Sequence, residues 1–113
     1  INKNEIGGII PKSIIKLTNL GSFNADNNKI KGNIPENVGN LKKLKTFSIS
    51  RNNIEGNIPE EFADLPELQN LMVNNNRLHG LIPHKVSQSP KWQSWHPEVC
   101  ILPQQKGYVL TIE

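Results

Sequence analysis

The 113-residue chain contains a single cysteine, Cys100, and aromatic residues make up only 5% of it. One cysteine excludes an internal disulfide framework. No apolar run approaches the roughly 18 residues of a membrane-spanning helix, so no membrane span is predicted. No signal peptide opens the sequence. Asparagine is frequent, yet the chain has no Asn-x-Ser/Thr sequon. The missing sequon favours a bacterial source or an unglycosylated compartment.

The charge of the chain is mild. Lysine and arginine total 13 against 10 acidic residues, which gives a formal net charge of +3. The only dense basic group is Lys42, Lys43 and Lys45, and no aromatic residue stands between these lysines. Proteins that bind nucleic acid usually gather basic residues on one face with aromatics between them. We therefore interpret the three lysines as a solvated turn and do not expect a nucleic-acid partner.

One pattern recurs with a period of 24 residues. It reads NNKIKGNIPENVGNLKKL from Asn27, NNIEGNIPEEFADLPEL from Asn52 and NNRLHGLIPHKVSQSPKW from Asn75, after a broken copy from Asn4. The positions that agree in register include these columns: Leu20, Leu44 and Leu68; Phe23, Phe47 and Leu71; Gly8, Gly32, Gly56 and Gly80; Pro11, Pro35, Pro59 and Pro83. A fixed period between 20 and 50 residues indicates a stacked array of repeats.

Each position of the repeat has a physical role. Alternating apolar and polar residues predict a short strand with one buried face, and stacked copies hide that face by parallel pairing. The asparagines Asn28, Asn52 and Asn76 stand where the chain must leave the sheet. Their amides both donate and accept, so we predict a ladder that satisfies buried backbone groups. The glycine permits a sharp path, and the proline ends a second extended segment before a tight helical turn.

The pattern L-x-x-L-x-L-x-x-N-x-L-x-G-x-I-P resembles the plant-specific 24-residue subtype of the leucine-rich repeat, over residues 4 to about 90. The resemblance implies an α/β-type, mostly β solenoid that curves as a right-handed stack. It implies a parallel sheet on the concave side, short helical turns on the convex side and a second, smaller strand at each Ile-Pro segment. The subtype is common in plant receptor ectodomains and inhibitors and also occurs in bacterial envelope proteins.

The last part of the chain departs from the pattern. We predict repeats over residues 1–89 and a C-terminal cap over residues 90–113, where the G-x-I-P signature is lost. Counting on from Leu68, the Leu, Leu, Leu, Asn and Leu positions hold Trp92, Trp95, Pro97, Cys100 and Leu102. The tryptophans would cover the open end of the core. A last strand is predicted from Tyr108 to Ile112. No N-terminal cap pattern is present, so we expect a sticky edge there, at which the protein extends upstream or self-associates.

The variable positions of the strands are predicted to face the concave side and to bind a partner. They are Asn24, Asp26, Asn27, Thr46, Ser48, Ser50, Arg51, Met72, Asn74 and Asn75, and the register continues through Ser94, His96 and Glu98. Arg51 is the predicted anchor because interface hot spots favour arginine, with Met72 beside it as an adaptable apolar contact. The alternative is that these columns are ordinary hydrated sheet surface.

Few residues suggest chemistry. His79, His84 and His96 could be combined with Cys100 as a zinc set. The register, however, places His79 on the second strand and His84 on the outer turn, away from His96. No metal site and no cofactor are therefore predicted. A cysteine nucleophile would need a histidine base beside it, and the repeat places Cys100 in an inward position instead. We expect it to be a buried structural residue.

The sequence thus predicts a non-enzymatic module that recognises a protein or peptide on its concave face, outside the cell or in the cell envelope. The missing sequons and the lone cysteine favour a bacterial surface or periplasm over the plant apoplast. Two alternatives stay open. The chain could be a structural spacer of a larger envelope protein, or the substrate-selecting part of an enzyme whose catalytic domain lies elsewhere.

Overall fold

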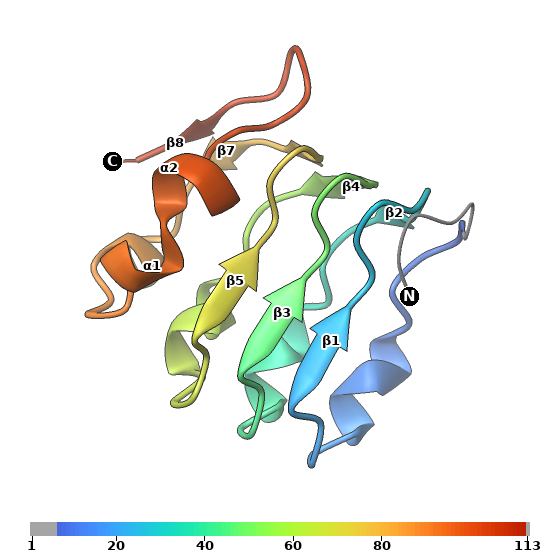
Figure 1. The fold of residues 1–113 in the computed structure, drawn as a ribbon, viewed down its shortest axis with the longest axis vertical. Helices are drawn as coiled ribbons and strands as arrows, with labels where there is room; N and C mark the ends of the chain where they lie inside the picture. Colours follow the sequence, from blue (N-terminus) through green and yellow to red (C-terminus); the bar gives the residue numbers. More distant parts are fainter. Residues whose placement is uncertain (1–6, 113) are drawn as a thin grey trace.

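Three short parallel strands form the sheet that the repeats predict. In the computed structural model, which describes residues 7–112, they are β1 (Ser22–Asn24), β3 (Thr46–Ser48) and β5 (Asn70–Met72), paired in that order. Successive coils lie side by side, with a strand on one side of each coil and a helical turn on the other (Figure 1). The predicted solenoid, with its parallel sheet and outer helical turns, is confirmed. The start of the broken first copy, at Asn4, lies outside the described residues.

A second sheet runs along the turn that leaves the first sheet. Its strands are β2 (Lys31–Gly32), β4 (Asn53–Gly56) and β6 (Arg77–Leu78), again parallel and in coil order. This is the smaller strand that the resemblance implied. The Ile-Pro segment itself follows these strands and leads the chain into the helical turns.

The outer side of each coil is a single short helical turn. The turns are η1 (Lys12–Lys16), η2 (Glu36–Asn40), η3 (Glu60–Asp64) and α1 (His84–Ser87). A proline precedes each one and accepts the first hydrogen bond of the turn, as Pro59 does from the Phe62 amide. Proline has no N–H to continue a strand ladder, and its fixed φ favours the start of a helical turn.

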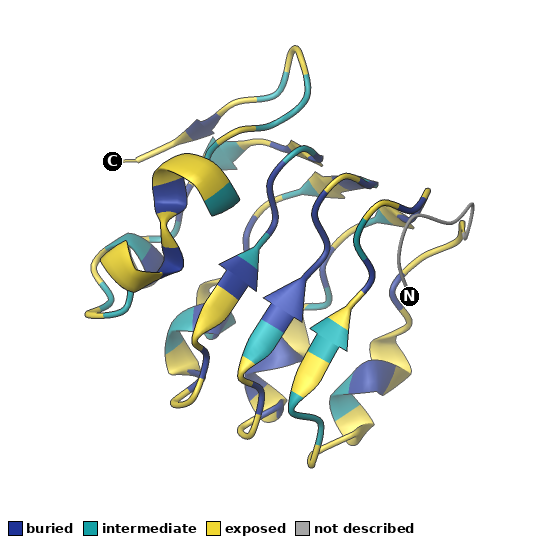
Figure 2. Ribbon diagram, viewed as in Figure 1, coloured by how far each residue is buried: buried dark blue, intermediate teal, exposed yellow. Residues whose placement is uncertain are grey.

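The core lies between the sheet and the helical turns. Leu44, Phe47, Ile49, Phe62 and Leu71 are almost completely buried there. The rings of Phe47 and Phe62, from the strand and the turn of the same coil, have centroids 5.2 Å apart. Burial is deepest in the middle coils and declines toward the first described coil (Figure 2). In that coil Ile9 is 61% exposed.

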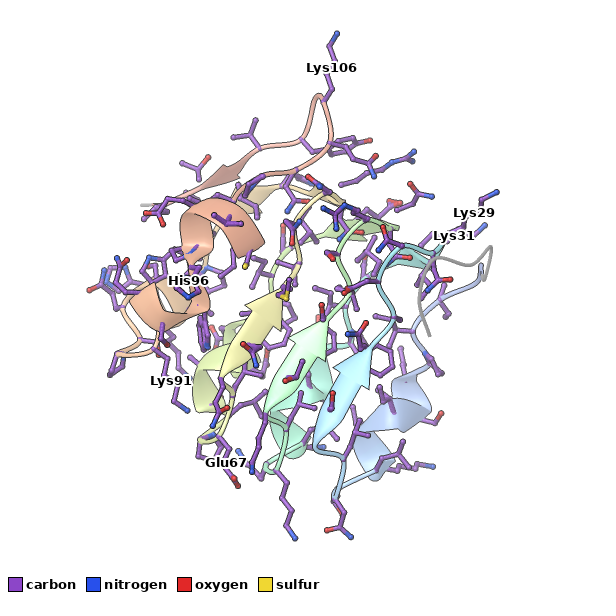
Figure 3. The ribbon with its side chains drawn as sticks, in the orientation of Figure 1. Lys29, Lys31, Glu67, Lys91, His96 and Lys106 are labelled. Atoms are coloured by element: carbon purple, nitrogen blue, oxygen red, sulfur yellow. The ribbon has the colours of Figure 1, made fainter. Side chains whose placement is uncertain are left out.

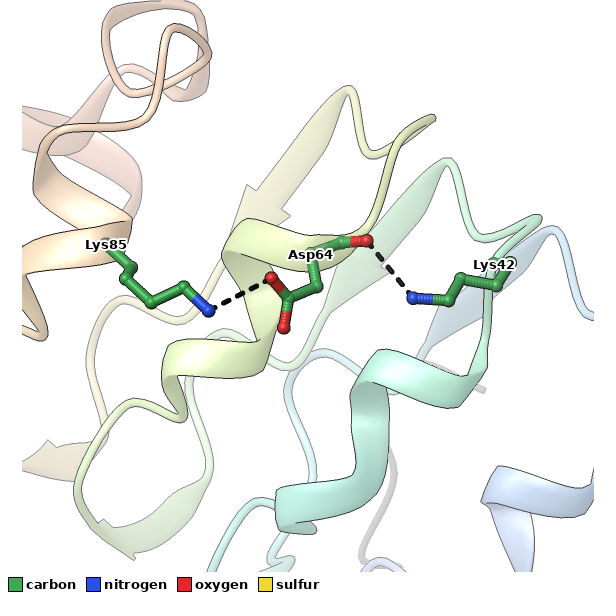
Figure 4. A network of polar contacts seen from close by, with 3 residues as sticks. All are labelled: Lys42, Asp64 and Lys85. Carbon is green, nitrogen blue, oxygen red and sulfur yellow. Dashed lines mark hydrogen bonds and ion pairs between the residues drawn. The ribbon is translucent and has the colours of Figure 1, made fainter.

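Lysines tie neighbouring helical turns together on the surface. The Lys85 ammonium lies 3.2 Å from the Asp64 carboxylate, and the Lys42 ammonium donates to the Asp64 carbonyl at 3.4 Å (Figure 4). The hydrogen bond and the charge of Asp64 raise the pKa of Lys85. Both side chains are largely exposed. Contacts of this kind contribute little to stability.

The cap does not contain the fourth concave strand that the register implied. Residues in that position form two short helices, η4 (Gln93–Trp95) and α2 (Pro97–Cys100), joined at His96 in the left-handed conformation with φ 52°. Proline cannot donate to a strand ladder but is well suited to the first turn of a helix. The predicted continuation of the concave strands through Ser94, His96 and Glu98 is therefore wrong.

The two tryptophans nevertheless close the end of the stack. Trp92 and Trp95 are buried, and the Trp95 indole N–H donates to the Leu68 carbonyl at 3.1 Å. Further along, β8 (Leu110–Thr111) pairs in parallel with β7 (Gly80–Leu81) and is shorter than the predicted final strand. Tyr108 and Ile112 lie outside it.

Candidate binding surface

The concave sheet presents polar side chains from three successive coils. Ser22, Asn24 and Asn70 are exposed, and Thr46 and Met72 are half-buried. The parallel register aligns Ser22 with Thr46 and Thr46 with Asn70. The side-chain amide of Asn70 donates to the Thr46 hydroxyl at 3.2 Å. The face is therefore an ordered array of short polar groups with one methionine at its C-terminal edge.

Ser48 and Ser50 do not present their side chains to a partner, which corrects the sequence-based expectation. Each is only 1% exposed. The Asp26 carboxylate leans from the preceding coil, accepting hydrogen bonds from the Ser48 hydroxyl at 2.8 Å and from the Ser50 amide at 2.8 Å. A serine between longer side chains on the flanking coils is covered by them. Asn74, 9% exposed, is likewise almost buried.

The chain turns sharply where each concave strand ends. Asn27, Arg51 and Asn75 all have left-handed backbones, with φ of 58°, 59° and 58°. The next coil imposes this conformation, since the amides of Asn27 and Arg51 donate to the carbonyls of Ser50 and Asn74. Asparagine tolerates the left-handed region, whereas arginine is uncommon there. Arg51 is exposed, and it forms no ion pair with any residue in the described part of the chain.

Asparagines inside the turns form a continuous hydrogen-bond ladder. The Asn52 side chain accepts from the Ile30 amide at 3.1 Å and donates to the Ala25 and Ile49 carbonyls at 3.0 Å each. Asn76 repeats the arrangement one coil later, accepting from the amides of Asn52 and Ile54 at 3.1 Å. Asn28 donates to the Ala25 carbonyl at 3.0 Å. Buried backbone groups are thus satisfied between coils.

The last rung of the ladder is a glutamine that the sequence analysis missed. Gln104 accepts from the amides of Asn76 and Leu78 at 3.1 Å each and donates to the carbonyls of Val73 and Ile101 at 3.0 and 2.9 Å. These are the partners that the side chain of a further ladder asparagine would have. Cys100, which the register placed in this position, contributes only its carbonyl, which accepts from the Val73 amide at 2.8 Å. The signal was an amide side chain shortly after the apolar pair Ile101 and Leu102.

The candidate chemical residues do not converge. The Cys100 thiol is half-buried, and desolvation raises its pKa, which disfavours the nucleophilic thiolate. His79 lies on the second-sheet side with its ring 6.3 Å from that of Tyr108, while His84 begins α1. Over residues 7–112, no group of three or more His, Cys, Asp or Glu side chains is arranged to hold a metal ion. Nor does this part of the chain contain a helix long and apolar enough to cross a membrane.

A hollow lies on the opposite side of the coils, between the Ile-Pro segments and the helical turns. Its volume is about 820 Å³. Its lining includes Pro35 and Pro59, together with the charged residues Lys12, Glu36, Glu60 and Glu61. This convex hollow contains charged side chains, whereas the side chains exposed on the three concave strands are uncharged.

Comparison with known proteins places the geometry in a family context. A sequence profile of the leucine rich repeat matches residues 26–78. The BIR2 ectodomain from Arabidopsis thaliana is similar in structure, with 31% identity over 78% of this chain and 46% of that chain and a TM-score of 0.73. The Arabidopsis receptor kinase HAESA, in complex with the peptide hormone IDA and the co-receptor SERK1, aligns with 99% of this chain and 17% of that chain, at 29% identity and TM-score 0.77. No curated protein sequence gave a match.

The same fold also serves a different purpose. A plant ice-binding protein aligns at 30% identity over 79% of this chain and 29% of that chain, with a TM-score of 0.75. The chain spans less than half of the BIR2 ectodomain and smaller shares of the others. These similar structures come from plants, so they give the predicted bacterial source no support. Because fold alone does not determine function, the surface chemistry must decide.

Proposed function

Since the chain is a leucine-rich-repeat solenoid of the plant type, we propose that it is a non-catalytic recognition module that binds a protein or peptide on its concave sheet. The observation that carries the proposal is the array of polar side chains from β1, β3 and β5, held in register by the stacked coils and ending at the exposed cation Arg51. A rigid array of this kind binds without the entropic cost of ordering a loop.

The similar plant structures support this proposal. HAESA was solved with a peptide hormone and a co-receptor, and BIR2 as an ectodomain. By analogy, we propose an extracellular location and a peptide or protein partner for this chain. The partner would contact Asn24, Thr46, Asn70 and Met72 on the sheet and Arg51 at its edge. Ser48 and Ser50 would support the surface from below.

Site-specific photo-crosslinking tests which face binds. Benzoylphenylalanine replaces Asn70, exposed on β5, in one variant and Asn37, exposed on the outer turn η2, in the matched control. Both variants are incubated with extracellular extract of the source tissue, irradiated, and analysed by mass spectrometry. We expect a protein or peptide adduct from the Asn70 variant and none from the Asn37 variant. Adducts from the Asn37 variant alone would move the binding face to the convex side and overturn the proposal.

A further inference from the structure

The last strand of the chain is paired on one side only. β8 pairs in parallel with β7, and no strand of residues 7–112 pairs with its other side. The Val109 carbonyl accepts from the Gly80 amide at 3.0 Å. The Thr111 carbonyl accepts from the Ile82 amide at 2.9 Å. Because backbone groups alternate sides along a strand, the N–H and C=O of Leu110 point away from β7, toward the side that has no strand.

Apolar side chains are exposed beside this edge. Leu81 on β7 is 60% exposed, Val109 just before β8 is 67% exposed, and Ile112 just after β8 is 45% exposed. Asn33 and Asn57 occupy the position of Leu81 in the two preceding coils. The repeat therefore changes from a polar to an apolar side chain in the coil that pairs with β8. Exposed apolar groups that gather beside an unpaired strand edge indicate an association surface.

The sequence of β8 lacks the features that usually prevent strands from pairing between molecules. Residues 108–112 read YVLTI, without charge, proline or glycine, and most of these residue types favour strands. Natural edge strands are usually protected by lysine or proline. The opposite end of the stack has such protection. Ile9 is exposed there, but it forms a bridge with Lys31, and Lys29 and Lys31 project together at that end (Figure 3). Near β8, Lys106 projects from the tip of the preceding turn (Figure 3).

A second copy of the chain fits this edge by symmetry. A strand edge matches itself when a two-fold axis relates two copies, because the same surface of each copy then contacts the other. The N–H and C=O of Leu110 allow antiparallel pairing centred on Leu110, in which the two copies exchange both hydrogen bonds. Val109 then lies opposite Thr111 of the second copy, and Tyr108 lies opposite Ile112 of the second copy. Pairs of aromatic and β-branched residues stabilise neighbouring strands.

The charges that flank β8 favour the antiparallel arrangement over the parallel one. In the sequence a cation, Lys106, precedes the strand, and an acid, Glu113, follows it. Antiparallel pairing brings the cation of each copy to the end of the strand at which the other copy has its acid. Parallel pairing would place like charges opposite each other, which is destabilising. The charge pattern of the strand is therefore complementary to itself in one orientation only.

From these observations we propose that β8 pairs in antiparallel orientation with β8 of a second copy and forms a two-fold symmetric dimer. The β7–β8 sheets of the two copies then become one sheet, and Leu81 and Val109 of each copy cover part of the joint. The edge is short, so the dimer is weak and dissociates on dilution. Because β8 is separate from the concave strands, the dimer carries two concave sheets. A partner with two binding segments would gain avidity from them.

Sedimentation velocity of the 113-residue chain, over a concentration series from ~10 µM to ~1 mM, tests the proposal. Leu81→Lys places a charge beside the edge. Leu17→Lys is the matched control, because Leu17 is 55% exposed in the first described coil, at the opposite end of the stack. We expect a reversible monomer–dimer equilibrium in the wild type. The dissociation constant should rise at least tenfold in Leu81→Lys and in Val109→Lys and less than twofold in Leu17→Lys. Thermal melts verify that each variant is folded.

Disulfide trapping tests the orientation of the pair. Val109 and Thr111 are replaced by cysteine in separate chains that also carry Cys100→Ser. In the antiparallel register these two positions form a non-hydrogen-bonded pair, with Cα atoms about 4.5 Å apart, which a disulfide can span. An equal mixture of the Val109→Cys and Thr111→Cys chains should therefore form covalent dimers at least fivefold faster than either chain alone.

Four results would overturn the assignment: a wild type that stays monomeric throughout the series, equal weakening by Leu81→Lys and Leu17→Lys, weakening by Leu17→Lys alone, or trapping in the mixture that is no faster than in the single chains. The third result would place the interface at the N-terminal end of the stack. The dimer and the concave binding face fail separately, because adducts at Asn70 require no second copy.

Discussion

The repeats and the cap meet the same physical demand in different ways. In both regions, each coil must supply hydrogen-bond partners for the buried backbone groups in the turn of the coil before it. In the repeats Asn52 and Asn76 do so from the end of a strand, whereas in the cap Gln104 does so after two short helices. The backbone groups that must be paired are the same in both regions. The backbone conformation that brings the side-chain amide to them differs. Buried N–H and C=O groups therefore need hydrogen-bond partners even where the repeat pattern of the sequence has ended.

The two regions also cover apolar surface differently. In the repeats, one strand and one turn of the next coil hide the core of the coil before. In the cap, Trp92 and Trp95 take over, and the Trp95 indole additionally pairs the Leu68 carbonyl. A large aromatic ring covers the area of several aliphatic side chains, so fewer residues suffice to end the stack.

Deletion of the cap is expected to have the largest effect on stability. Deletion of residues 90–113 exposes Leu68, Leu71 and Val73 and leaves the ladder without its last amide. Terminal repeats need a covering, so the truncated chain should aggregate and lose cooperative unfolding. Light scattering and a thermal melt measure both. A monomer that melts cooperatively at the wild-type temperature would show that the cap is dispensable.

Substitution of Asn52, an interior asparagine of the ladder, should have the next largest effect on stability. Asn52→Leu removes one acceptor and one amide donor from buried backbone groups, and we expect a loss of about 1–3 kcal/mol in the free energy of unfolding. Asn37→Leu, at an exposed position on η2, is the control and should change stability by less than about 0.5 kcal/mol. Denaturant midpoints give both values. If the Asn52 variant matched its control, the ladder bonds would not support the stack.

Arg51 distinguishes stability from recognition within the repeats. Arg51→Asn places at this left-handed position the residue that both neighbouring coils use, and it should raise stability by about 0.5–1 kcal/mol. The same change should weaken binding of the crosslinked partner by about 1–3 kcal/mol if Arg51 is a hot spot. Denaturant unfolding and calorimetry measure the two effects. Unchanged stability together with unchanged affinity would remove Arg51 from both arguments.

Cys100 gives the smallest effect, and it reports on the packing of the cap. Partial burial raises the pKa of its thiol, so alkylation by iodoacetamide should reach half its limiting rate at a higher pH in the folded protein than in urea. The folded state then keeps the proton where the unfolded chain has lost it. Stability should accordingly be constant below the ordinary thiol pKa and fall as the pH rises above it. Identical alkylation profiles in both states would mean that the cap leaves Cys100 solvated.

The fold of the repeats could be predicted from the sequence because each aligned position of the repeat holds one kind of residue. Leu44, Phe47 and Ile49 alternate inward, Asn52 follows where the strand ends, and Pro59 precedes the turn. What it could not predict was the exposure of Ser48 and Ser50. That depends on how far the Asp26 side chain reaches from another coil, which no local pattern records.

In the cap, the 24-residue register was extended to residues whose backbone no longer has the conformation of the repeats. The register puts Pro97 in a strand position, yet Pro97 begins the helix α2 after the left-handed His96. Moving the strand into a helix shifted the ladder position from Cys100 to Gln104. A count of positions cannot detect such a shift, because it assumes the same rise per residue in strand and helix.

Amide hydrogen exchange in a Gln104→Met variant tests most directly whether Gln104 is the last rung of the ladder. The amides of Asn76 and Leu78 donate to its side chain, whereas the Ile54 amide donates to Asn76 and serves as the internal reference. Protection of the first two should fall roughly ten- to a hundredfold, as expected for losing about 1–3 kcal/mol, while Ile54 and a Gln105→Met control keep theirs. Unchanged protection of Asn76 and Leu78 in the Gln104 variant would contradict the account.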